Sequence, residues 1–319
     1  ISDMKVFNRY VSEATIEALT QMVDGFNAAS NGTIVLTSEG FEGDFFERSF
    51  YAGLEAAQRR VDRYASNSSV SSTALSQLSE NSVKVAGGFG PIIFEPAQMS
   101  YMMKNEAEAI DVMSRRGAEL IVKDQFNTAI KALVAAISNQ STAKNDVSAS
   151  AGLSYSALNN AHAKFGDASN SLVAQVMTGA AYHKLIGQNL TNATVLFKAD
   201  NILVVEILGK PVLVTDCADL YTAGTPNKMK VLSLVSGAAV IMDSGDMVSN
   251  IETSNGNARI QTTYQVDYTF GLGLKGYTWD TTNGGKSPSD AELGTGSNWD
   301  LIENIKSSAG VITIADADL

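Results

Sequence analysis

The sequence predicts an α+β protein organised around one very long helix. Residues 105–139 contain no proline and a single glycine, Gly117, and a helix of this length spans about 50 Å at about 1.5 Å per residue. An extended segment broken by glycines precedes the helix, and helix and strand patterns with a closing antiparallel pair follow it. A compact enzyme rarely needs such a helix, whereas a flat subunit that covers a surface does.

The N-terminal part is predicted to consist of short elements joined by polar loops. Residues 9–29 have the apolar spacing of an amphipathic helix, and a short β-branched strand follows at 33–37. A second amphipathic helix is expected over 44–61. Its cationic edge consists of Arg48, Arg59, Arg60 and Arg63.

The segment before the long helix is extended. After a serine-rich loop at 65–72, residues 82–94 read S-V-K-V-A-G-G-F-G-P-I-I-F, with strand-like residues on both sides of the glycines. Such strands are an aggregation hazard when their edges stay unpaired. We therefore expect this segment to find a partner by strand addition.

The long helix has a plausible beginning and one apolar stripe. Asn105 can cap it, with Glu108 reaching back from three residues further on. The stripe consists of Ile110, Met113, Leu120, Phe126, Ile130, Leu133, Val134 and Ile137. Because the stripe is not a sustained heptad, packing on a sheet is favoured over a coiled coil. Residues 138–150 are small and polar and are expected to form a linker.

The second half alternates between helix and strand. Helices are expected at 154–165 and 180–188. Strands are expected at 172–177, 202–207, 211–215, 230–235 and 238–242. An antiparallel pair, 251–254 with 259–274, flanks Asn255-Gly256-Asn257, which is a strong hairpin signal. A loop-rich stretch and a last strand at 311–314 close the chain.

The composition restricts the function. The chain has 319 residues, 45% of them hydrophobic, which suffices for a packed core. Its 23 basic and 34 acidic residues give a net charge of −11, whereas nonspecific nucleic-acid binders use Lys and Arg to neutralise phosphates. If the protein lies near DNA, we expect it to repel DNA rather than bind it. No apolar run suggests a membrane span, so no membrane partner is expected.

The candidate chemical sites are weak. Cys217 is the only cysteine, which excludes an intramolecular disulfide, and a buried thiol is the preferred interpretation. His162 and His183 lie in helix-like stretches and are interpreted as structural. We therefore expect no catalytic residue, no metal site and no cofactor.

Two glycine motifs resemble phosphate loops. Residues 271–276 match G-x-G-x-x-G, but a strand or turn follows them instead of the helix that must face a pyrophosphate. Gly285-Lys286-Ser287 lies in a polar loop without the required earlier glycine. Neither motif is interpreted as a nucleotide site.

Several strings and their order resemble the major capsid proteins of tailed bacteriophages, whose fold is shared by encapsulins. The strings are F-N-A-A-S-N-G at 26–32, F-E-G-D-F-F at 41–46, L-N-N-A-H-A-K-F-G-D at 158–167 and Y-T-F-G-L-G-L-K-G-Y at 268–277. The resemblance covers nearly the whole chain.

The resemblance implies a fold with an N-terminal arm, an extended E-loop hairpin, a peripheral domain with a long spine helix, and an axial α/β domain. The implied ranges are 1–35 for the arm, 36–100 for the E-loop with its flanks, 101–149 for the spine helix, 150–250 for the axial domain and 251–319 for the returning peripheral strands. Possible E-loop contacts between neighbouring subunits are Arg63, Lys84 and Phe89. Some relatives join subunits by Lys–Asn isopeptide bonds, and Lys84 lies in the corresponding segment, although a plain surface lysine is the preferred interpretation.

The function implied is a structural subunit that self-assembles into pentamers and hexamers of an icosahedral virion shell in the host cytoplasm. Scaffold or decoration proteins and a portal are implied partners, and packaged double-stranded DNA would be a neighbour without specific binding. A cleaved scaffolding segment would explain why the sequence begins with Ile1, as would a trimmed sequence. An encapsulin-like bacterial compartment, or a soluble α/β enzyme with a carboxylate site, are the alternatives.

Overall fold

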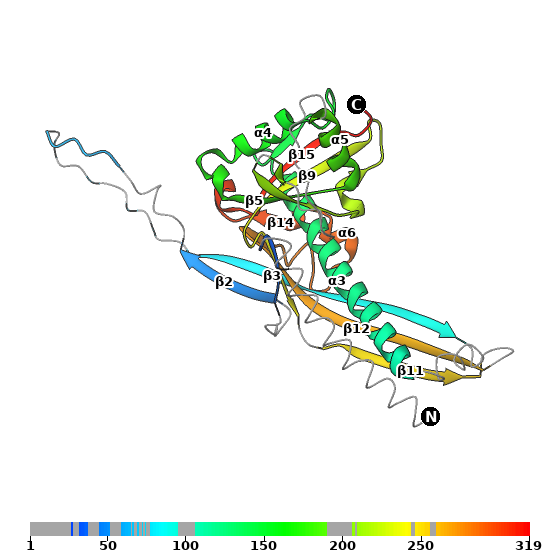
Figure 1. Ribbon diagram of the computed structural model, residues 1–319. Helices are drawn as coiled ribbons and strands as arrows, with labels where there is room; N and C mark the ends of the chain where they lie inside the picture. The colour runs from blue at the N-terminus through cyan, green and yellow to red at the C-terminus, as the bar shows by residue number, and fades with distance from the viewer. Residues whose placement is uncertain are drawn as a thin grey trace.

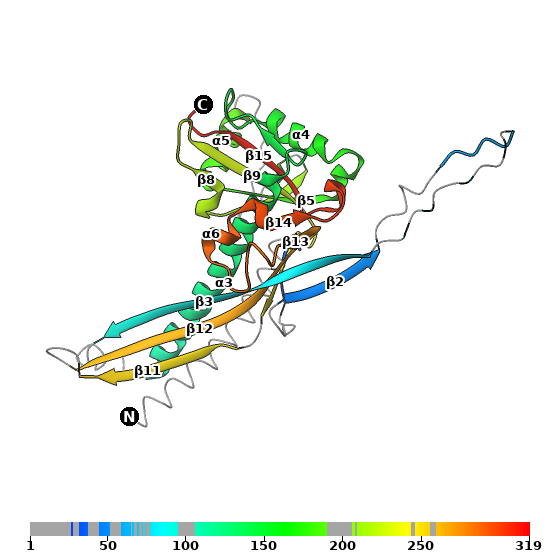
Figure 2. The same cartoon turned by 180° about the vertical axis from the view of Figure 1, so that it is seen from behind.

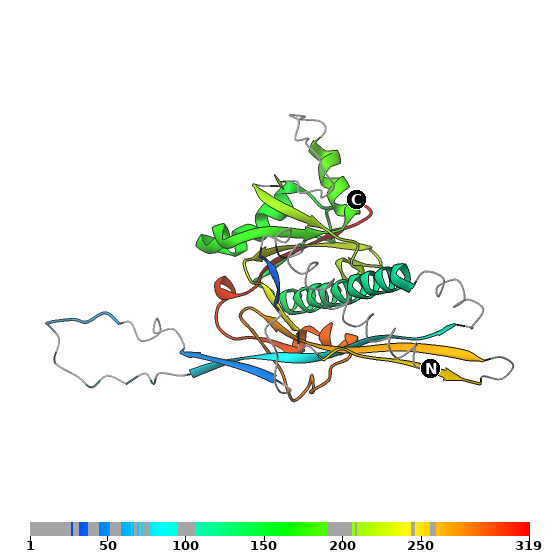
Figure 3. The same cartoon turned by 60° about the horizontal axis from the view of Figure 1, so that its bottom comes forward.

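In the computed structural model, one long helix packs against two large β-sheets (Figure 1). The structure describes residues 27, 32–37, 45–51, 59–64, 66, 69, 72, 74, 77–94, 106–189, 206–207, 209–243, 246–255 and 260–319. The helix, α3 (Glu106–Asn139), lies between a seven-stranded sheet and a long six-stranded sheet, as Figure 3 shows. Among the described residues, no helix is long and apolar enough to cross a membrane.

The six-stranded sheet is a long ribbon. Its strand order is β1-β10-β12-β3-β2, with β11 also paired to β12. The bounds are β1 Ile34–Thr37, β2 Phe45–Tyr51, β3 Gln77–Phe94, β10 Ala239–Asp243, β11 Val248–Ser254 and β12 Gln261–Leu274. At about 3.3 Å per residue, the 18-residue β3 is about 60 Å long.

The long β3–β12 pair forms the centre of the ribbon and contains one β-bulge. The strands are antiparallel from Leu272 opposite Val83 to Thr262 opposite Phe94. Gly90 and Pro91 together stand against Gln265, since Phe89 pairs with Val266 and Ile92 with Tyr264. Gly90 has a φ of 105°, a backbone conformation that only glycine adopts readily.

The seven-stranded sheet forms the compact end of the molecule. Its order is β4-β15-β9-β5-β7-β6, with β8 paired to β9. The bounds are β4 Lys144–Asp146, β5 Leu172–Met177, β6 Glu206–Ile207, β7 Lys210–Val214, β8 Tyr221–Thr222, β9 Lys228–Val235 and β15 Gly310–Asp316. All seven residues of β15 are buried, which marks this strand as the centre of the core.

Helices cover both faces of this sheet. The helices α4 (Tyr155–Lys164) and α5 (Gly179–Asn189) pack on one face through a cluster that includes Leu158, Leu185 and Val231. The side chain of Ser154 caps α4 by accepting a hydrogen bond from the backbone N–H of Ala157. The other face packs in the main core with the buried side chains of α3.

The segment after the ribbon packs against the C-terminal half of α3. It contains β13 (Tyr277–Trp279), α6 (Asp290–Leu293) and β14 (Trp299–Leu301), seen from behind in Figure 2, together with short 3₁₀ turns. Trp279 and Trp299 are both buried and meet edge to face with their ring centroids 4.7 Å apart. Each indole N–H donates to a backbone carbonyl, of Gly285 and Leu293 respectively.

The prediction of a helix over 44–61 is wrong. Residues Phe45–Tyr51 form β2 instead and pair antiparallel with Gln77–Val83 of β3. The sequence F-F-E-R-S-F-Y is rich in aromatic residues, which favour strands. A partner from a distant part of the chain therefore outweighs the local helical spacing.

The expected linker at 138–150 is also wrong. The helix α3 continues to Asn139, and β4 pairs in parallel with β15 at the edge of the seven-stranded sheet. Three residues are too few to show a period in the sequence, so such a strand is visible only through its partner. The assignment of Leu120 to the apolar stripe of the helix is also wrong, since 51% of its surface is exposed.

Most other elements are confirmed. The strand at 172–177 has the expected bounds, and α4, α5, β9, β10 and β12 differ from expectation by one or two residues. Only Asn27 of the helix expected at 9–29 is described, and the cap Asn105 and the turn after Asn255 lie outside the described residues. The strand β10 lies in the ribbon and β15 lies in the seven-stranded sheet, and the expected division at residue 250 stays a prediction.

Candidate assembly surfaces

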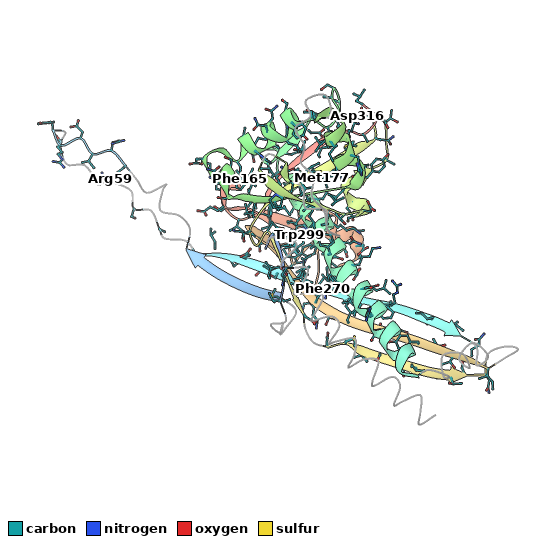
Figure 4. All side chains as sticks on the ribbon, viewed as in Figure 1. Arg59, Phe165, Met177, Phe270, Trp299 and Asp316 are labelled. Carbon is teal, nitrogen blue, oxygen red and sulfur yellow. The ribbon has the colours of Figure 1, made fainter. Side chains whose placement is uncertain are left out.

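The first candidate surface is a short arginine-rich stretch far from both sheets. Residues 59–64 read R-R-V-D-R-Y, and every one of them is exposed. Figures 1–3 show this stretch well beyond the end of β2, and Figure 4 labels Arg59 there. We call residues 59–64 the arm tip.

The side chains of the arm tip contribute little to the fold of their own chain. Tyr64 is 100% exposed and Val61 is 61% exposed. The backbone N–H of Tyr64 donates to the carboxylate of Asp62 over 2.9 Å, which holds a local turn. Three arginines and one aspartate give this stretch a positive charge in a chain whose net charge is −11.

Arg and Tyr are the residue types that dominate the centres of protein interfaces. An exposed tyrosine among arginines offers apolar area together with hydrogen-bond donors. The arm tip therefore has the chemistry of a contact surface for an acidic partner.

The second candidate surface is the ribbon. One face of β12 packs toward α3 through buried alternate residues, among them Tyr268, Phe270 and Leu272. The hydroxyl of Tyr268 donates to the carboxylate of Asp124 on α3 over 2.7 Å. Burial and this bond both raise the pKa of Tyr268 well above its usual range, so the hydroxyl keeps its proton.

On the opposite face of the ribbon, no described helix covers the strands. Gln265 and Asp267 alternate with the buried residues of β12 and are exposed. Large apolar residues are exposed along the ribbon at Ile92, Ile93, Val248 and Ile260. Scattered exposed apolar residues are normal, but their concentration on the elongated part of the molecule indicates a surface that another chain covers.

The structure separates the three residues expected to make E-loop contacts. Arg63 lies in the arm tip, whereas Lys84 and Phe89 lie within β3. The ammonium group of Lys84 is 3.9 Å from the carboxylate of Asp246, and the ring of Phe89 contacts Tyr264 edge to face with centroids 6.2 Å apart. Lys84 and Phe89 therefore have partners in their own chain, and contacts of all three residues with neighbouring subunits stay a prediction.

Sequence reasoning missed Val61 and Tyr64 and assigned Arg59 and Arg60 to a helix edge. The available signal was the string R-R-V-D-R-Y itself, with three arginines among six residues of an acidic chain. What the sequence did not show is that no described core residue packs on this string.

The motifs that resemble chemical sites have structural roles. Residues 271–274 are the end of β12, and a turn at Lys275-Gly276 leads into β13, so no helix N-terminus faces them. Lys286 lies in a loop between β13 and α6. Neither place has the geometry of a phosphate site.

His162 and Cys217 also have structural roles. His162 is buried, and its Nε2 lies 2.9 Å from the hydroxyl of Ser233 on β9. Burial, with a smaller contribution from the charge of Lys210, lowers the pKa of His162 to about 4. Cys217 is buried and its burial raises the pKa of the thiol, which makes it a poor nucleophile.

A hollow beside the C-terminal half of α3 contains three charged side chains. It is lined by Lys131, Ser138, Asp219 and Lys230, among others. Lys131 forms a 3.0 Å ion pair with Asp290; burial lowers its pKa, but the bond to Asp290 and the charge of Asp219 outweigh this and raise it. Lysines thus accompany the carboxylates here, and among the described residues no cluster of His, Cys, Asp or Glu could hold a metal ion.

Comparisons with known proteins agree with a shell subunit. The model of the family described as major capsid protein 13-like (Gp13-like) matches residues 3–312. No curated protein sequence matches the chain. Among solved structures, a chain of the cyanophage Pam1 capsid asymmetric unit aligns with a TM-score of 0.52 at 10% identity, over 89% of this chain and 88% of that one. A chain of Microbacterium phage Oxtober96 aligns with a TM-score of 0.52 at 12% identity, over 91% and 90%.

Proposed function

The chain belongs to the major capsid protein 13-like family, and from this premise we propose that its copies form pentamers and hexamers of an icosahedral shell around double-stranded DNA. The protein is a structural component of a phage capsid and not an enzyme. Its fold is that of phage capsid proteins.

The observation that carries the proposal is the exposed arm tip. A segment that projects from the body in a ring of identical copies meets the next copy head to tail, and such heterologous contacts close rings. Tyr64 and the arginines at 59, 60 and 63 would then contact an acidic neighbour, which the net charge of −11 provides. Each contact is weak alone and gains strength through repetition around the ring.

The proposed roles of the residue ranges follow the family. Residues 1–35 would be the N-terminal arm, 36–100 the E-loop with its flanks and 101–149 the spine helix. Residues 150–250 would form the axial domain and 251–319 the returning peripheral strands. In this proposal, β10 of the axial range pairs in the ribbon, and β15 of the peripheral range pairs in the seven-stranded sheet.

The charge of the chain supports DNA as a neighbour that is packaged but not bound. Acidic residues outnumber basic ones by 34 to 23, so the protein lacks the excess of cations that binds phosphates nonspecifically. Scaffold or decoration proteins and a portal are further proposed partners, and assembly in the host cytoplasm is part of the same proposal.

Reversal of the arm-tip charge tests the assembly contact. We expect the triple variant Arg59→Glu, Arg60→Glu, Arg63→Glu to fold normally but to lose nearly all particles in negative-stain electron microscopy and light scattering. The triple Arg→Lys variant at the same positions is the matched control, because it keeps the charge; it should retain assembly in part, since Lys lacks the planar fork of Arg.

Normal particles from the triple Glu variant would contradict the role of the arm tip. A wild-type chain that never forms particles or rings would contradict the shell itself. Nuclease-protected DNA inside native particles is the expected content, whereas a protein cargo without DNA would indicate a compartment instead of a virion.

A further inference from the structure

The strand β11 is an edge of the ribbon. It pairs with β12 on one side, from Val248 opposite Asp267 to Ser254 opposite Gln261, and no other described strand pairs with it. Val248 is 65% exposed, and every second residue along the strand is exposed as well. The outward N–H and C=O groups of an edge strand are a template for another strand.

At the end of the ribbon where β11 lies, beyond the part of β3 that β2 covers, the opposite edge is protected against such pairing. There, β3 carries the bulge at Gly90 and Pro91, and proline has no N–H to donate. By contrast, β11 reads V-S-N-I-E-T-S, without proline, glycine or lysine, and its seven pairs with β12 run without a register shift. At this end of the ribbon the two edges thus differ, and β11 is the one that has neither a bulge nor a proline and that no other described strand covers.

The sequence of β11 is complementary to itself in one antiparallel register. With Ile251 of two copies opposite each other, all seven residues find a partner, and Glu252 stands opposite Asn250. A register centred on Glu252 would instead oppose two like charges, which destabilises a strand pair. A register centred on Asn250 would leave the last two residues of the strand unpaired.

The same register orients both copies alike. Residues directly opposite each other in a strand pair point to the same side of the sheet, so both copies direct the α3-covered face of their ribbons to one side. A closed shell needs this arrangement at its two-fold axes, because every copy must turn the same face inward. Pairing of unlike residues such as Asn250 with Ile251 would invert one copy.

We propose that β11 is a self-association site, where two copies of this chain pair antiparallel about Ile251 across a two-fold axis. The inference rests on the proposed shell function and adds to it a contact between like surfaces, distinct from the head-to-tail contact of the arm tip. One strand pair buries little area, so the contact is weak in solution and becomes stable in the repeated array of a shell.

Cysteine crosslinking tests the register. In the proposed pair the two residues at 251 have Cα atoms about 4.5–5.5 Å apart, within the range of a disulfide. The two residues at 253 are four positions apart, about 13 Å, and cannot be joined. Under mild oxidation of particles, we expect Ile251→Cys to give about tenfold more covalent dimer on a non-reducing gel than Thr253→Cys. The wild-type chain is the background control, since Cys217 is buried.

A charge series at Asn250 tests the same contact without a covalent trap. Asn250 is exposed, and its proposed partner is Glu252 of the second copy. Asn250→Glu should lower the particle yield several-fold and Asn250→Lys should keep or raise it, whereas Asn159→Glu on the exposed side of α4 should change nothing.

Electron microscopy of the same samples separates the two proposals. Particles that form without a dimer at position 251, or with equal dimer from both cysteine variants, would overturn the β11 contact and leave the shell function intact. Equal yields from the Glu and Lys variants at 250 would overturn it as well. Absence of particles from the wild-type chain would instead overturn the shell function.

Discussion

The two large sheets of this molecule bury their side chains in different ways. The seven-stranded sheet has helices on both faces, and its strand β15 is buried at every residue. The six-stranded ribbon is covered by α3 on one face, while its other face, its β11 edge and the arm tip are exposed. The compact end therefore buries its own side chains, whereas the described parts of the ribbon and arm tip keep exposed surfaces that the proposed shell contacts would cover.

The largest effect on stability is expected in the compact half of the molecule. Trp299 is fully buried, donates to the carbonyl of Leu293 and contacts Trp279. Trp299→Ala should lower the free energy of unfolding by about 4 kcal/mol, because it leaves a large cavity. Chemical denaturation monitored by circular dichroism measures this free energy of unfolding. Val248→Ala, at an exposed position of the ribbon, is the matched control and should cost less than about 0.5 kcal/mol.

The pH dependence of stability is also expected to originate in the compact half. The pKa of His162 is lowered from 6.5 to about 4 by burial. Between these values the unfolded chain takes up a proton that the folded chain refuses, so stability is highest above pH 6.5 and falls by up to about 3 kcal/mol toward pH 4.

Unfolding free energies measured at intervals from pH 7 to pH 4 would show this slope. The variant His162→Gln has no titrating group and should give a flatter profile over the same range. An equal slope in both proteins would assign the effect to other groups.

Two glycine-to-alanine variants, one on β3 and one on α5, compare the ribbon with an exposed helix surface. A Cβ on Gly87 of β3 would lie 2.7 Å from the ring of Tyr268, which crosses over this strand on its way to Asp124. Gly87→Ala should therefore cost about 2 kcal/mol. Gly187→Ala on α5, where nothing lies within 4 Å of the added methyl group, should instead stabilise by about 0.5–1 kcal/mol. Thermal denaturation of both variants gives the sign of the change in stability. A loss of stability of similar size in both variants would contradict the role of Tyr268.

The smallest effect is expected on the outer face of the ribbon. Lys84 pairs with Asp246 at 3.9 Å, and both side chains are partly exposed. Because exposed ion pairs contribute little, Lys84→Met should change the free energy of unfolding by less than about 1 kcal/mol, with the difference shrinking in high salt. A cost of several kcal/mol would show that this face is better packed than its exposure indicates.

The elements with a strong local pattern could be predicted from the sequence. Ser154 caps α4 where a helix was expected, and the apolar run at 172–177 is a strand with those bounds. The apolar stripe predicted for the second half of α3 is also found, since Ile130, Leu133 and Ile137 are all buried. Periodicity and capping act over a few residues, so the sequence contains them in full.

The candidate surfaces were harder to predict, because exposure is a property of the whole fold. Arg63, Lys84 and Phe89 lie within one short stretch of sequence, yet β3 takes the latter two into a sheet and leaves Arg63 outside. No local feature of Lys84 indicates the ion pair with Asp246, which stands far along the chain.

By itself, the sequence determined the long helix, the alternation of helices and strands, the acidic charge, the absence of a catalytic motif and the resemblance to capsid proteins. Only the tertiary structure decided that Phe45–Tyr51 is a strand, that β4 joins β15, and that β1 lies beside β10. The physical reason is that a strand acquires its hydrogen bonds from residues distant in the chain. The same reason explains why the β11 edge, which no other described strand covers, is visible only in the tertiary structure.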